Sequence, residues 1–408
     1  MKTIKDSVHD HIEVEGVARD LLDTPAVQRL RRIKQLGPAD LVYPSANHTR
    51  FEHSLGVYYL ACEALDQLGI RGKQAERVRA AAMLHDVGHS PYSHAIEEVI
   101  YRHTDKYHDD VHELLAENEV SDVLREHGHA PDTIADLIAG DGKLGQLVSG
   151  ELDVDRMDYL VRDAHHTGVP YGTIDHARLV RELTLIDGEL VLAAGNVPTA
   201  ESLLLARALM NPTVYNHHVT RIARGLLQRA SERLLEASDV TPKQLRRMDD
   251  YDLLVALRET PETAEYARRL SQRDLYKRAV WAEMRDVPEG VIDADYETLR
   301  EYEADIAADA DVDPGEVIIE VLDRPSMTES ESRVIVNGEI RRLDEQSALV
   351  SALQHVQREQ WRLGVYAPAG ATEAVGHAAE RVLGLETDGA LVSEVRTAGT
   401  PTTLDQFE

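Results

Sequence analysis

Four residues in three short segments of this sequence could bind one metal ion. His85 and Asp86 are adjacent at the end of an apolar run, just before Gly88. Successive residues of a helix project about 100° apart, so a neighbouring histidine and aspartate at a helix end can flank the same cation. His53, from an earlier segment, and Asp155, from a later one, would complete the set. The sequence therefore predicts a metal site of two imidazoles and two carboxylates.

These ligand types indicate a catalytic metal rather than a structural one. Imidazoles and carboxylates without a thiolate suit one divalent transition metal, which could be Fe, Mn, Zn, Ni or Co. Such an ion can lower the pKa of a bound water and polarise a phosphoryl oxygen. A lone His-Asp pair is a weak signal, because most such pairs are surface or capping residues. Here the pair is accompanied by a cluster of further basic side chains, which favours a site that holds and cleaves a polyphosphate. The cluster is Arg50, His89, His94 and His108.

Helices are expected to position these residues. Apolar residues recur at helical spacing from Arg50 to Gly69 and from Glu76 to Val87, and a third helix is predicted from about Val154 to His166. One face of the third helix would present a metal ligand, an aromatic ring and a second carboxylate to the same cavity. The residues on that face are Asp155, Tyr159, Asp163 and His166.

The fold expected is mainly α, with a helical core over residues 1–236 and a small C-terminal α+β lobe over 314–386. Residues 237–313 are predicted as a helical extension and an acidic connection, and residues 387–408 as a frayed tail. Within the core, Glu201 to Glu236 is predicted to be helical and Asp187-Gly188 to turn a hairpin. The lobe is expected to contain the strands 317–322 and 361–366, an Asn337-Gly338 hairpin and the helices 345–358 and 371–383.

The composition is strongly acidic. The 73 Asp and Glu against 44 Lys and Arg give a formal net charge of -29, and the chain has only 2 Phe and 2 Trp. An acidic surface poor in lysine and aromatic residues is typical of adaptation to a high-salt cytoplasm, as in haloarchaea, where a Debye length of ~3 Å screens the repulsion. The 43% of hydrophobic residues argues against a disordered protein or a mimic of nucleic acid.

Several classes of function are disfavoured by the same bulk properties. General nucleic-acid binding normally needs a basic face, although local arginine clusters could still hold a nucleotide. Cys62 is the single cysteine, so no intrachain disulfide is possible. We find no signal peptide and no apolar stretch approaching ~18 residues. We therefore expect a soluble, cytoplasmic protein without a membrane partner.

Long motifs in a fixed order resemble those of a known family. The segments Lys2–Glu13 and Asp23–Gly37, followed by the three metal segments and continuing to about Val219, resemble the deoxynucleoside triphosphate triphosphohydrolases of the HD-domain phosphohydrolase superfamily. The resemblance implies an HD-type helical core and the conversion of a dNTP and water to a deoxynucleoside and inorganic triphosphate. It also implies a homo-oligomer, either a dimer or a tetramer, and possible Mg on the triphosphate.

The resemblance implies a substrate role for ten residues. Gln35 and Asp163 would hold the sugar 3′-hydroxyl, Leu36 would pack beneath the sugar, and Tyr159 would block a 2′-hydroxyl. Asn211 departs from the His of the human family member, and Arg156 replaces a Lys, which keeps the charge but changes its geometry. Phosphate contacts are implied for Arg50, His89, His94, Arg156 and Arg207, and packing against the base for Tyr215.

The catalytic residues implied are His108, His94 and Asp86, of which Asp86 also binds the metal. His108 is followed by Asp109, and a carboxylate beside an imidazole raises its pKa and suits a general acid that protonates the leaving 5′-oxygen. Glu97 matches a further acidic position near it. The sequence leaves open whether water or His94 attacks phosphorus. It also leaves open that the segment 107–112 is a solvated loop.

A regulatory nucleotide at a subunit interface is a further implication. The matching residues are Lys2, Asp23, Gln28, Arg31, Arg273 and Lys277. Asp23-Thr24-Pro25 is equally a good helix start, with Asp or Thr as the cap and Pro in the first turn. Two other functions remain open: hydrolysis of another phosphate ester, such as a nucleoside monophosphate or cyclic dinucleotide, and nucleotide binding without turnover. The intact metal set argues against the last.

Overall fold

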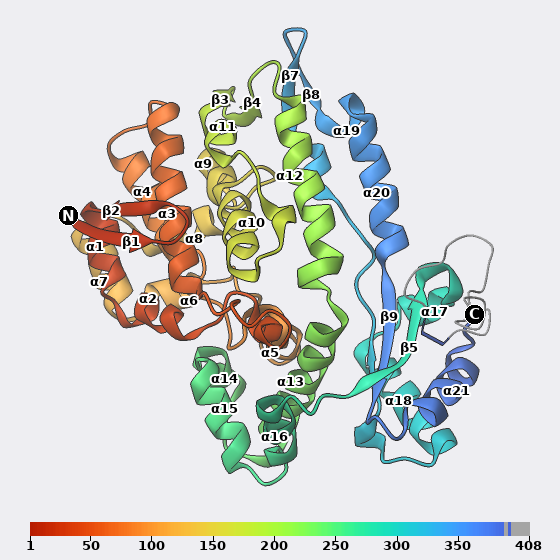
Figure 1. Ribbon diagram of the computed structural model, residues 1–408. Helices are drawn as coiled ribbons and strands as arrows, with labels where there is room; N and C mark the ends of the chain where they lie inside the picture. The colour runs from red at the N-terminus through yellow and green to blue at the C-terminus, as the bar shows by residue number, and fades with distance from the viewer. Residues whose placement is uncertain (387–390, 393–408) are drawn as a thin grey trace. The chain divides into compact units, whose positions relative to one another are not determined.

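The computed structural model describes residues 1–386 together with 391 and 392, which form two compact units. Unit 1 comprises Met1–Asp274 and Ser326–Val356. Unit 2 comprises Leu275–Pro325 and the described residues from Gln357 onward. The predicted lobe 314–386 is therefore divided between the units, and most of the predicted tail 387–408 lies outside the described residues. The fold is mainly α with small sheets, as expected (Figure 1).

Unit 1 contains the helices that carry the predicted metal residues. Its helices are α1 (Gly16–Leu22), α2 (Pro25–Arg29), α3 (Arg50–Gln67), α4 (Lys73–Leu84), α5 (Glu97–Thr104), α6 (His112–Ala116), α7 (Asn118–Glu126), α8 (Pro131–Ile138), α9 (Gly142–Val148), α10 (Val154–Thr167), α11 (His176–Arg181), α12 (Val197–Met210), α13 (His218–Ala237), α14 (Pro242–Arg247), α15 (Asp250–Glu259), α16 (Ala264–Gln272), α19 (Leu343–Gln346) and α20 (Ala348–Gln360), the last of which runs on into unit 2. The three helices predicted around the metal residues correspond to α3, α4 and α10.

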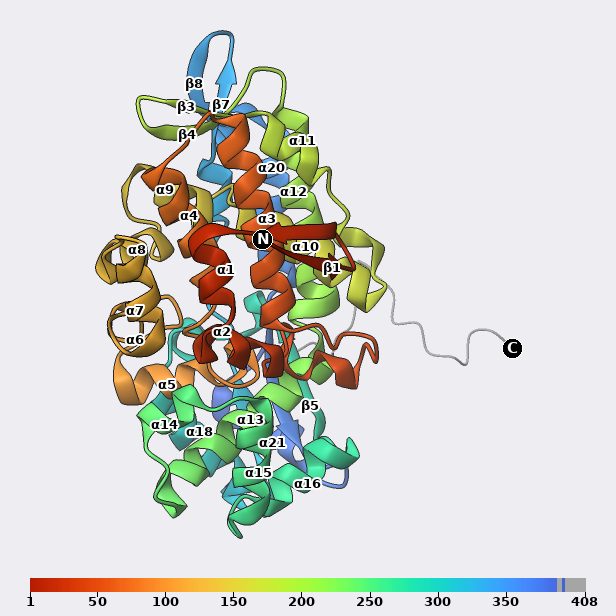
Figure 2. The same cartoon turned by 90° about the vertical axis from the view of Figure 1, so that its left-hand side faces the viewer.

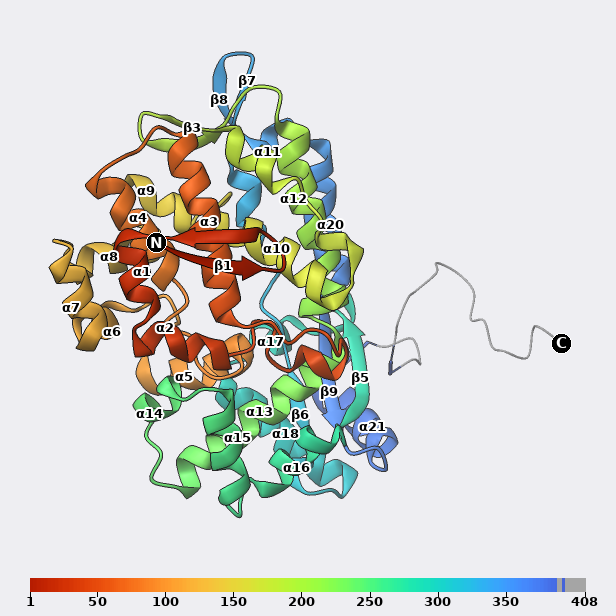
Figure 3. The same ribbon diagram turned by 60° about the vertical axis from the view of Figure 1, so that its left-hand side comes forward.

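Two small sheets belong to unit 1. β1 (Lys2–Asp6) and β2 (Asp10–Val14) form an antiparallel hairpin that packs on α3 (Figures 2 and 3). The other sheet has the order β3-β4-β7-β8, in which β4 and β7 are parallel. Its strands are β3 (Leu183–Ile186), β4 (Glu189–Leu192), β7 (Arg333–Val336) and β8 (Glu339–Arg342), and both hairpins turn at the predicted Asp187-Gly188 and Asn337-Gly338 pairs.

The core of unit 1 explains why α4 can hold a rigid site. Ala80, Ala81, Ala82, Met83 and Leu84 have no solvent exposure, so this helix is surrounded by other elements. The same core includes apolar residues from 326–356, which is why this late segment belongs to unit 1. These residues are Met327, Val334, Leu343, Val350 and Leu353.

The predicted helix 201–236 is interrupted in the structure. It consists of α12 and α13, separated by a π-helical turn over Asn211–Tyr215. Pro212 lies in this turn, and proline cannot donate the backbone hydrogen bond of a regular helix. The wide turn places Asn211 and Tyr215 at the wall of a cavity, which is described below.

Unit 2 is built on an antiparallel sheet of order β5-β9-β6, with strands β5 (Lys277–Glu283), β6 (Ile318–Glu320) and β9 (Arg362–Ala367). Its helices are α17 (Glu289–Ile292), α18 (Tyr296–Ala310) and α21 (Thr372–Leu383). The segment 277–283 was expected to be helical, and the acidic stretch 292–314 to be an exposed connection or a loosely packed helix. Instead α18 buries Ile306 and Ala307, and buried Glu303 accepts a hydrogen bond from the backbone N–H of Ile319 at 2.7 Å.

Candidate active site

The predicted metal residues meet in unit 1. His53 Nε2 lies 2.8 Å from Asp155 Oδ1, 3.3 Å from His85 Nε2 and 3.9 Å from Asp86 Oδ2. His85 Nε2 lies 3.4 Å from Asp86 Oδ1. One nitrogen or oxygen atom from each of His53, His85 and Asp86 lies within 4.8 Å of the other two, so a single ion could contact all three. The arrangement fits the metal that the sequence implies.

Helix caps fix the two helices that approach from either side. At the start of α3, Glu52, the residue before His53, accepts a hydrogen bond from the backbone N–H of Thr49 at 2.7 Å. At the start of α10, Asp153 accepts from the backbone N–H of Arg156 at 2.7 Å. Asp155 therefore lies in the first turn of a capped helix and points its carboxylate at His53.

The electrostatics of the set favour a cation. Burial alone would raise the pKa of Asp86, but the Arg50 guanidinium at 3.0 and 3.1 Å and two neighbouring histidines hold it well below its usual range. Burial alone would lower the pKa of His53, but hydrogen bonds with Asp155 and Asp158 and the charge of Asp86 raise it to about 10. The carboxylates thus hold a proton on His53 that a divalent ion would displace.

Behind His53 lies a buried network that the sequence analysis did not identify. Asp158 Oδ2 is 2.7 Å from His53 Nδ1, and Asp158 Oδ1 is 2.6 Å from His9 Nε2. Arg162 donates to both oxygens of Asp158, at 2.8 and 3.0 Å, and to Asp6 at 2.9 Å. A carboxylate on Nδ1 leaves Nε2 to face the metal position, which is the usual arrangement behind a metal-bound histidine.

The hairpin β1–β2 supplies two members of this network. Asp6 and His9 lie at its turn, and Asp6 also accepts from the backbone N–H groups of Val8 and His9 at 2.9 and 2.8 Å. The spacing of Asp158 and Arg162, four residues apart on one helix, was the available signal for this ion pair. The contacts to Asp6 and His9 carried no such signal, because they join residues about 150 positions apart.

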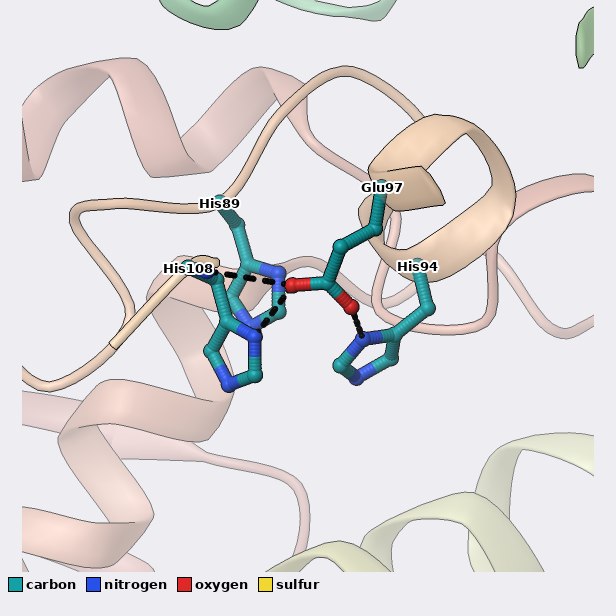
Figure 4. Close-up of side chains that lie close together, drawn as sticks. All are labelled: His89, His94, Glu97 and His108. Atoms are coloured by element: carbon teal, nitrogen blue, oxygen red, sulfur yellow. Dashed lines mark hydrogen bonds and ion pairs between the residues drawn. The ribbon is translucent and has the colours of Figure 1, made fainter. Parts of the chain in front are cut away.

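A second cluster contains His89, His94, Glu97 and His108 (Figure 4). Glu97 lies between two rings: one oxygen is hydrogen-bonded to Nδ1 of His108 and the other lies 2.7 Å from Nδ1 of His94. The ring of His108 stacks on His89 with centroids 4.1 Å apart. The atoms are close enough to hold a metal ion, yet both Glu97 oxygens are already engaged, which favours an acid–base cluster.

Glu97, rather than adjacent Asp109, is therefore the carboxylate bound to the His108 ring. Burial would lower the pKa of His108, but the hydrogen bond and charge of Glu97 raise it, with only a small contribution from Asp109. Burial instead lowers the pKa of His94 and of His89. His108 is thus the member of the cluster best able to carry a proton at neutral pH.

A cavity of about 390 Å³ adjoins both clusters. It is lined by nearly all the residues for which the sequence implied a substrate, catalytic or metal-binding role: Gln35, Leu36, Arg50, His85, Asp86, His89, His94, His108, Asp155, Tyr159, Asp163, Arg207 and Tyr215. His53 lies behind this wall. Arg156 is not among the lining residues, because its guanidinium donates to the carboxylate of its own helix cap, Asp153, at 2.7 Å and to the carbonyl of Gly150. Arg224 and Thr220 line the cavity on α13 and were not anticipated.

Polar groups of Asp163, Tyr215 and Gln35 lie in the wall of the cavity. Asp163 accepts a hydrogen bond from the Tyr215 hydroxyl at 3.0 Å and contacts His48 Nε2 at 2.8 Å. The rings of Tyr159 and Tyr215 meet edge to face, 6.1 Å apart. Gln35 is 7% exposed, and its Oε1 atom accepts no hydrogen bond from any described residue. A buried acceptor of this kind is costly unless a ligand donates to it.

The residues matched to a regulatory nucleotide fall into separate places. Lys2 forms an ion pair with Asp23, and Arg31 donates to Gln28 at 2.9 Å. Arg273 donates to the carbonyl of Leu41 at 2.8 Å. Lys277 begins β5 in unit 2. Neither Asp23 nor Thr24 caps α2 with its side chain; the Thr24 hydroxyl donates instead to the carbonyl of Leu21.

Comparisons with known families agree with this geometry. A model of the HD domain matches residues 50–163, which hold the metal set, and a model of the HD associated region matches residues 174–394. The chain belongs to the HD-domain phosphohydrolase family. Among the described residues, no helix has the length and apolar character needed to cross a membrane.

The relatives of this HD-domain protein differ in how much of their chains it covers. An uncharacterized protein of Methanocaldococcus jannaschii is 32% identical over 90% of this chain and 79% of its own. The human deoxynucleoside triphosphate triphosphohydrolase SAMHD1 is 31% identical over 59% of this chain but only 45% of its own. A solved phosphohydrolase of Bacteroides thetaiotaomicron superposes with a TM-score of 0.71 at 28% identity, over 90% of this chain and 100% of its own.

Replacing Asp155 by alanine should remove the metal and the activity together. The variant loses a charged ligand that lies 2.8 Å from His53, and we expect metal content and hydrolytic rate to fall in parallel, by roughly 100-fold or more. Elemental analysis and initial rates measure both. Asp136→Ala, which removes an exposed carboxylate on α8, is the control. Full metal content in Asp155→Ala would show that Asp155 is not a metal ligand.

The close approach of α3 to α10 requires glycine at position 56. A Cβ there would meet Asp158 Oδ1 at 1.9 Å and Arg162 Nη2 at 2.5 Å. Gly56→Ala should therefore displace the carboxylate behind His53, lowering the free energy of unfolding by about 1–3 kcal/mol and weakening metal retention. Gly290→Ala in α17, where an added Cβ meets nothing within 4 Å, is the matched control in thermal unfolding. Equal midpoints for the two variants would contradict this account.

Proposed function

We propose that this HD-domain phosphohydrolase is a dNTP triphosphohydrolase, which converts a dNTP and water to a deoxynucleoside and inorganic triphosphate. The observation that carries this proposal is a pair of polar residues in the cavity wall, Gln35 and Asp163. The buried Gln35 oxygen receives no hydrogen bond from the described residues, and both it and the Asp163 carboxylate could accept one from the hydroxyl of a sugar. A hydrolase for phosphate esters without a sugar would have no use for such a pair.

Tyr159 supports the deoxyribose part of the proposal. It is one turn after Asp155 on α10, lines the cavity and packs between the metal set and Tyr215, with its ring 6.5 Å from that of His53. A ring held between two neighbours cannot move aside at low cost, because interiors are close-packed. A 2′-hydroxyl would therefore meet a fixed obstacle.

Basic residues around the metal set support the triphosphate part. Arg50, Arg207 and Arg224 line the cavity, and a guanidinium can bind phosphate oxygens through two parallel hydrogen bonds. We infer that these residues balance the charge of the leaving triphosphate, and Arg156, which is paired with Asp153, has a smaller part than the sequence implied.

The chemistry assigned to the chain's own residues is acid catalysis and orientation. His53, His85, Asp86 and Asp155 would hold a divalent metal, which when bound would polarise the α-phosphoryl group and activate water. As the bond between the α-phosphorus and the 5′-oxygen breaks, His108 donates its proton to that oxygen. Glu97 holds the His108 ring through Nδ1, so that Nε2 is the atom that donates.

Product analysis with each dNTP tests the proposal directly. We expect deoxynucleoside and intact triphosphate in equal amounts, with loss of activity after chelation and recovery on adding back a divalent transition metal. Release of pyrophosphate or orthophosphate instead would assign the site to another phosphate ester. Binding of dNTP without any product would make the protein a nucleotide-binding regulator.

Tyr159→Ala should relax the choice of sugar. Removing the ring opens space for a 2′-hydroxyl, and we expect the ratio of GTP to dGTP hydrolysis to rise by about tenfold or more. Initial rates with paired ribo- and deoxyribonucleotides measure this ratio. Tyr251→Ala, at an exposed ring on α15, should leave it unchanged. Equal hydrolysis of GTP and dGTP by the unaltered protein would refute the steric role of Tyr159.

Assembly is a second part of the proposal. Lys2 pairs with Asp23 and Arg31 with Gln28, and the family resemblance implies a regulatory nucleotide bound by these residues between subunits. We expect a homo-oligomer whose association and rate both increase with GTP or dGTP, since a ligand that prefers the assembled form must also favour assembly. Light scattering and initial rates at high salt measure the two effects. An unchanged mass and GTP-independent kinetics would leave these residues with structural roles.

A further inference from the structure

The loop that carries His108 depends on contacts from elsewhere in unit 1. Residues 105–111 join α5 to α6 without regular secondary structure, so their backbone carbonyls need partners outside the loop. Arg246, on α14, donates from Nη2 to the carbonyl of Tyr107 at 2.9 Å and to that of Asp110 at 2.7 Å. One guanidinium therefore holds the backbone on both sides of His108.

A second arginine ties the loop that carries His89 to the same helix. Arg29 Nη2 donates to the carbonyl of His89 at 2.6 Å and to those of Arg246 and Met248 at 3.0 and 2.8 Å. Its Nε donates to the carbonyl of Arg247 at 2.8 Å. The C-terminal carbonyls of α14 and the His89 carbonyl are thus fixed to a single side chain.

Arg246 and Arg29 hold the His108 loop and the His89 loop against one helix, α14. The rings of His89 and His108 are nearly parallel, with an angle of 12° between them. The loops also touch directly, because a Cβ on Gly88 would lie 2.0 Å from the carbonyl oxygen of His108. A shift of α14 or of Arg246 would therefore change the position of His108 relative to His89 and Glu97.

The helix α14 is firmly anchored, and Arg246 is not part of its apolar anchor. Leu245 is fully buried in a core shared with Leu253 and Leu257. Arg246 instead lines a second cavity of about 610 Å³, together with Arg29, Gly88 and Lys106. Shortening a side chain that borders a cavity enlarges open space and leaves the apolar core intact, so an Arg246 variant should still fold.

We propose that Arg246 is a positioning residue for the hydrolytic reaction, which acts by holding the His108 loop so that the imidazole meets both Glu97 and the leaving oxygen. This inference rests on the proposed role of His108 as the general acid. It assigns a part of the catalytic apparatus to residues beyond 236, which the sequence analysis treated as an extension of the core. A misplacement of ~1 Å at a reacting group can cost ~100-fold in rate.

Kinetics of three variants test this role. In Arg246→Ala we expect kcat to fall about tenfold while KM stays within about twofold, with metal content and thermal midpoint close to those of the unaltered protein. Arg246→Lys keeps a cationic donor and should recover a large part of kcat. Arg247→Ala is the control, because this neighbouring guanidinium pairs with exposed Glu117 at 3.1 Å. An unchanged kcat in Arg246→Ala would overturn the proposal. It would also be overturned if Arg246→Ala and Arg247→Ala lost the same fraction of kcat and showed the same decrease in thermal midpoint.

A spectroscopic readout separates this inference from the proposed function. In protein labelled with ¹⁵N-histidine, the Nδ1–H proton of His108, assigned by its absence in His108→Gln, should exchange slowly because it is held by Glu97. In Arg246→Ala this resonance should broaden or disappear, and in Arg247→Ala it should persist. The measurement needs no turnover, so it decides the positioning role even if the triphosphohydrolase activity is refuted. An unaltered His108 resonance in Arg246→Ala would overturn the role.

Discussion

The carboxylate of Asp158 is the contact on which the metal set depends. It is fully buried, and it engages His53, His9 and Arg162 through its two oxygens. Burial alone would raise its pKa, but the Arg162 charge and these hydrogen bonds hold it well below the usual range. Breaking a buried pair by removing one partner typically costs about 3–5 kcal/mol, because the other charge is left uncompensated. The Asp158 carboxylate holds the proton on Nδ1 of His53, and this hydrogen bond fixes both the tautomer of the ring and the direction in which Nε2 points.

The two clusters around the cavity use carboxylates in contrasting ways. In the metal set, Asp86 and Asp155 concentrate negative charge where a cation is needed, and Arg50 offsets part of it. In the second cluster, Glu97 is shared between two imidazoles and acts to raise the pKa of both, but burial outweighs it at His94, so only the pKa of His108 is raised. Adjacent groups with pKa values moved in opposite directions are typical of sites that perform acid–base chemistry. The cavity thus joins a cation site to a proton donor over a short distance.

How much the sequence could predict depended on the range of the contacts involved. The helices α3, α4 and α10 were predictable because their apolar residues recur at helical spacing, and α10 carried its site residues on one face. Glu97 was harder to identify as the partner of His108, because eleven positions separate them and Asp109 is adjacent. The contacts of the hairpin β1–β2 with Asp158 and Arg162, and the contact from Arg246, are tertiary features. Neither periodicity nor local spacing encodes them, since each depends on how distant segments pack.

The interruption between α12 and α13 was likewise hidden by continuous helical periodicity, although Pro212 was a signal for it. The acidic stretch 292–314 was interpreted as an exposed connection or a loosely packed helix, and it contains a helix, α18, with a buried face. In α18 the acidic residues face solvent over a narrow apolar stripe, and a single buried Glu303 is satisfied by a backbone N–H group. Acidic composition alone therefore says little about order when a few apolar residues lie at helical spacing.

The contact between Arg162 and Asp6 has a consequence for how the chain reaches its native state. The two residues are 156 positions apart, so the pair closes a loop that spans the whole HD domain. Contacts of such long range form late, because the entropy of loop closure must be overcome before they contribute. During synthesis the hairpin at the N-terminus leaves the ribosome long before α10 does. Until then Asp6 and His9 lack their contacts with Arg162 and Asp158, and His53 lacks the carboxylate that orients its ring. The hairpin β1–β2 therefore completes the site only after α10 has been made.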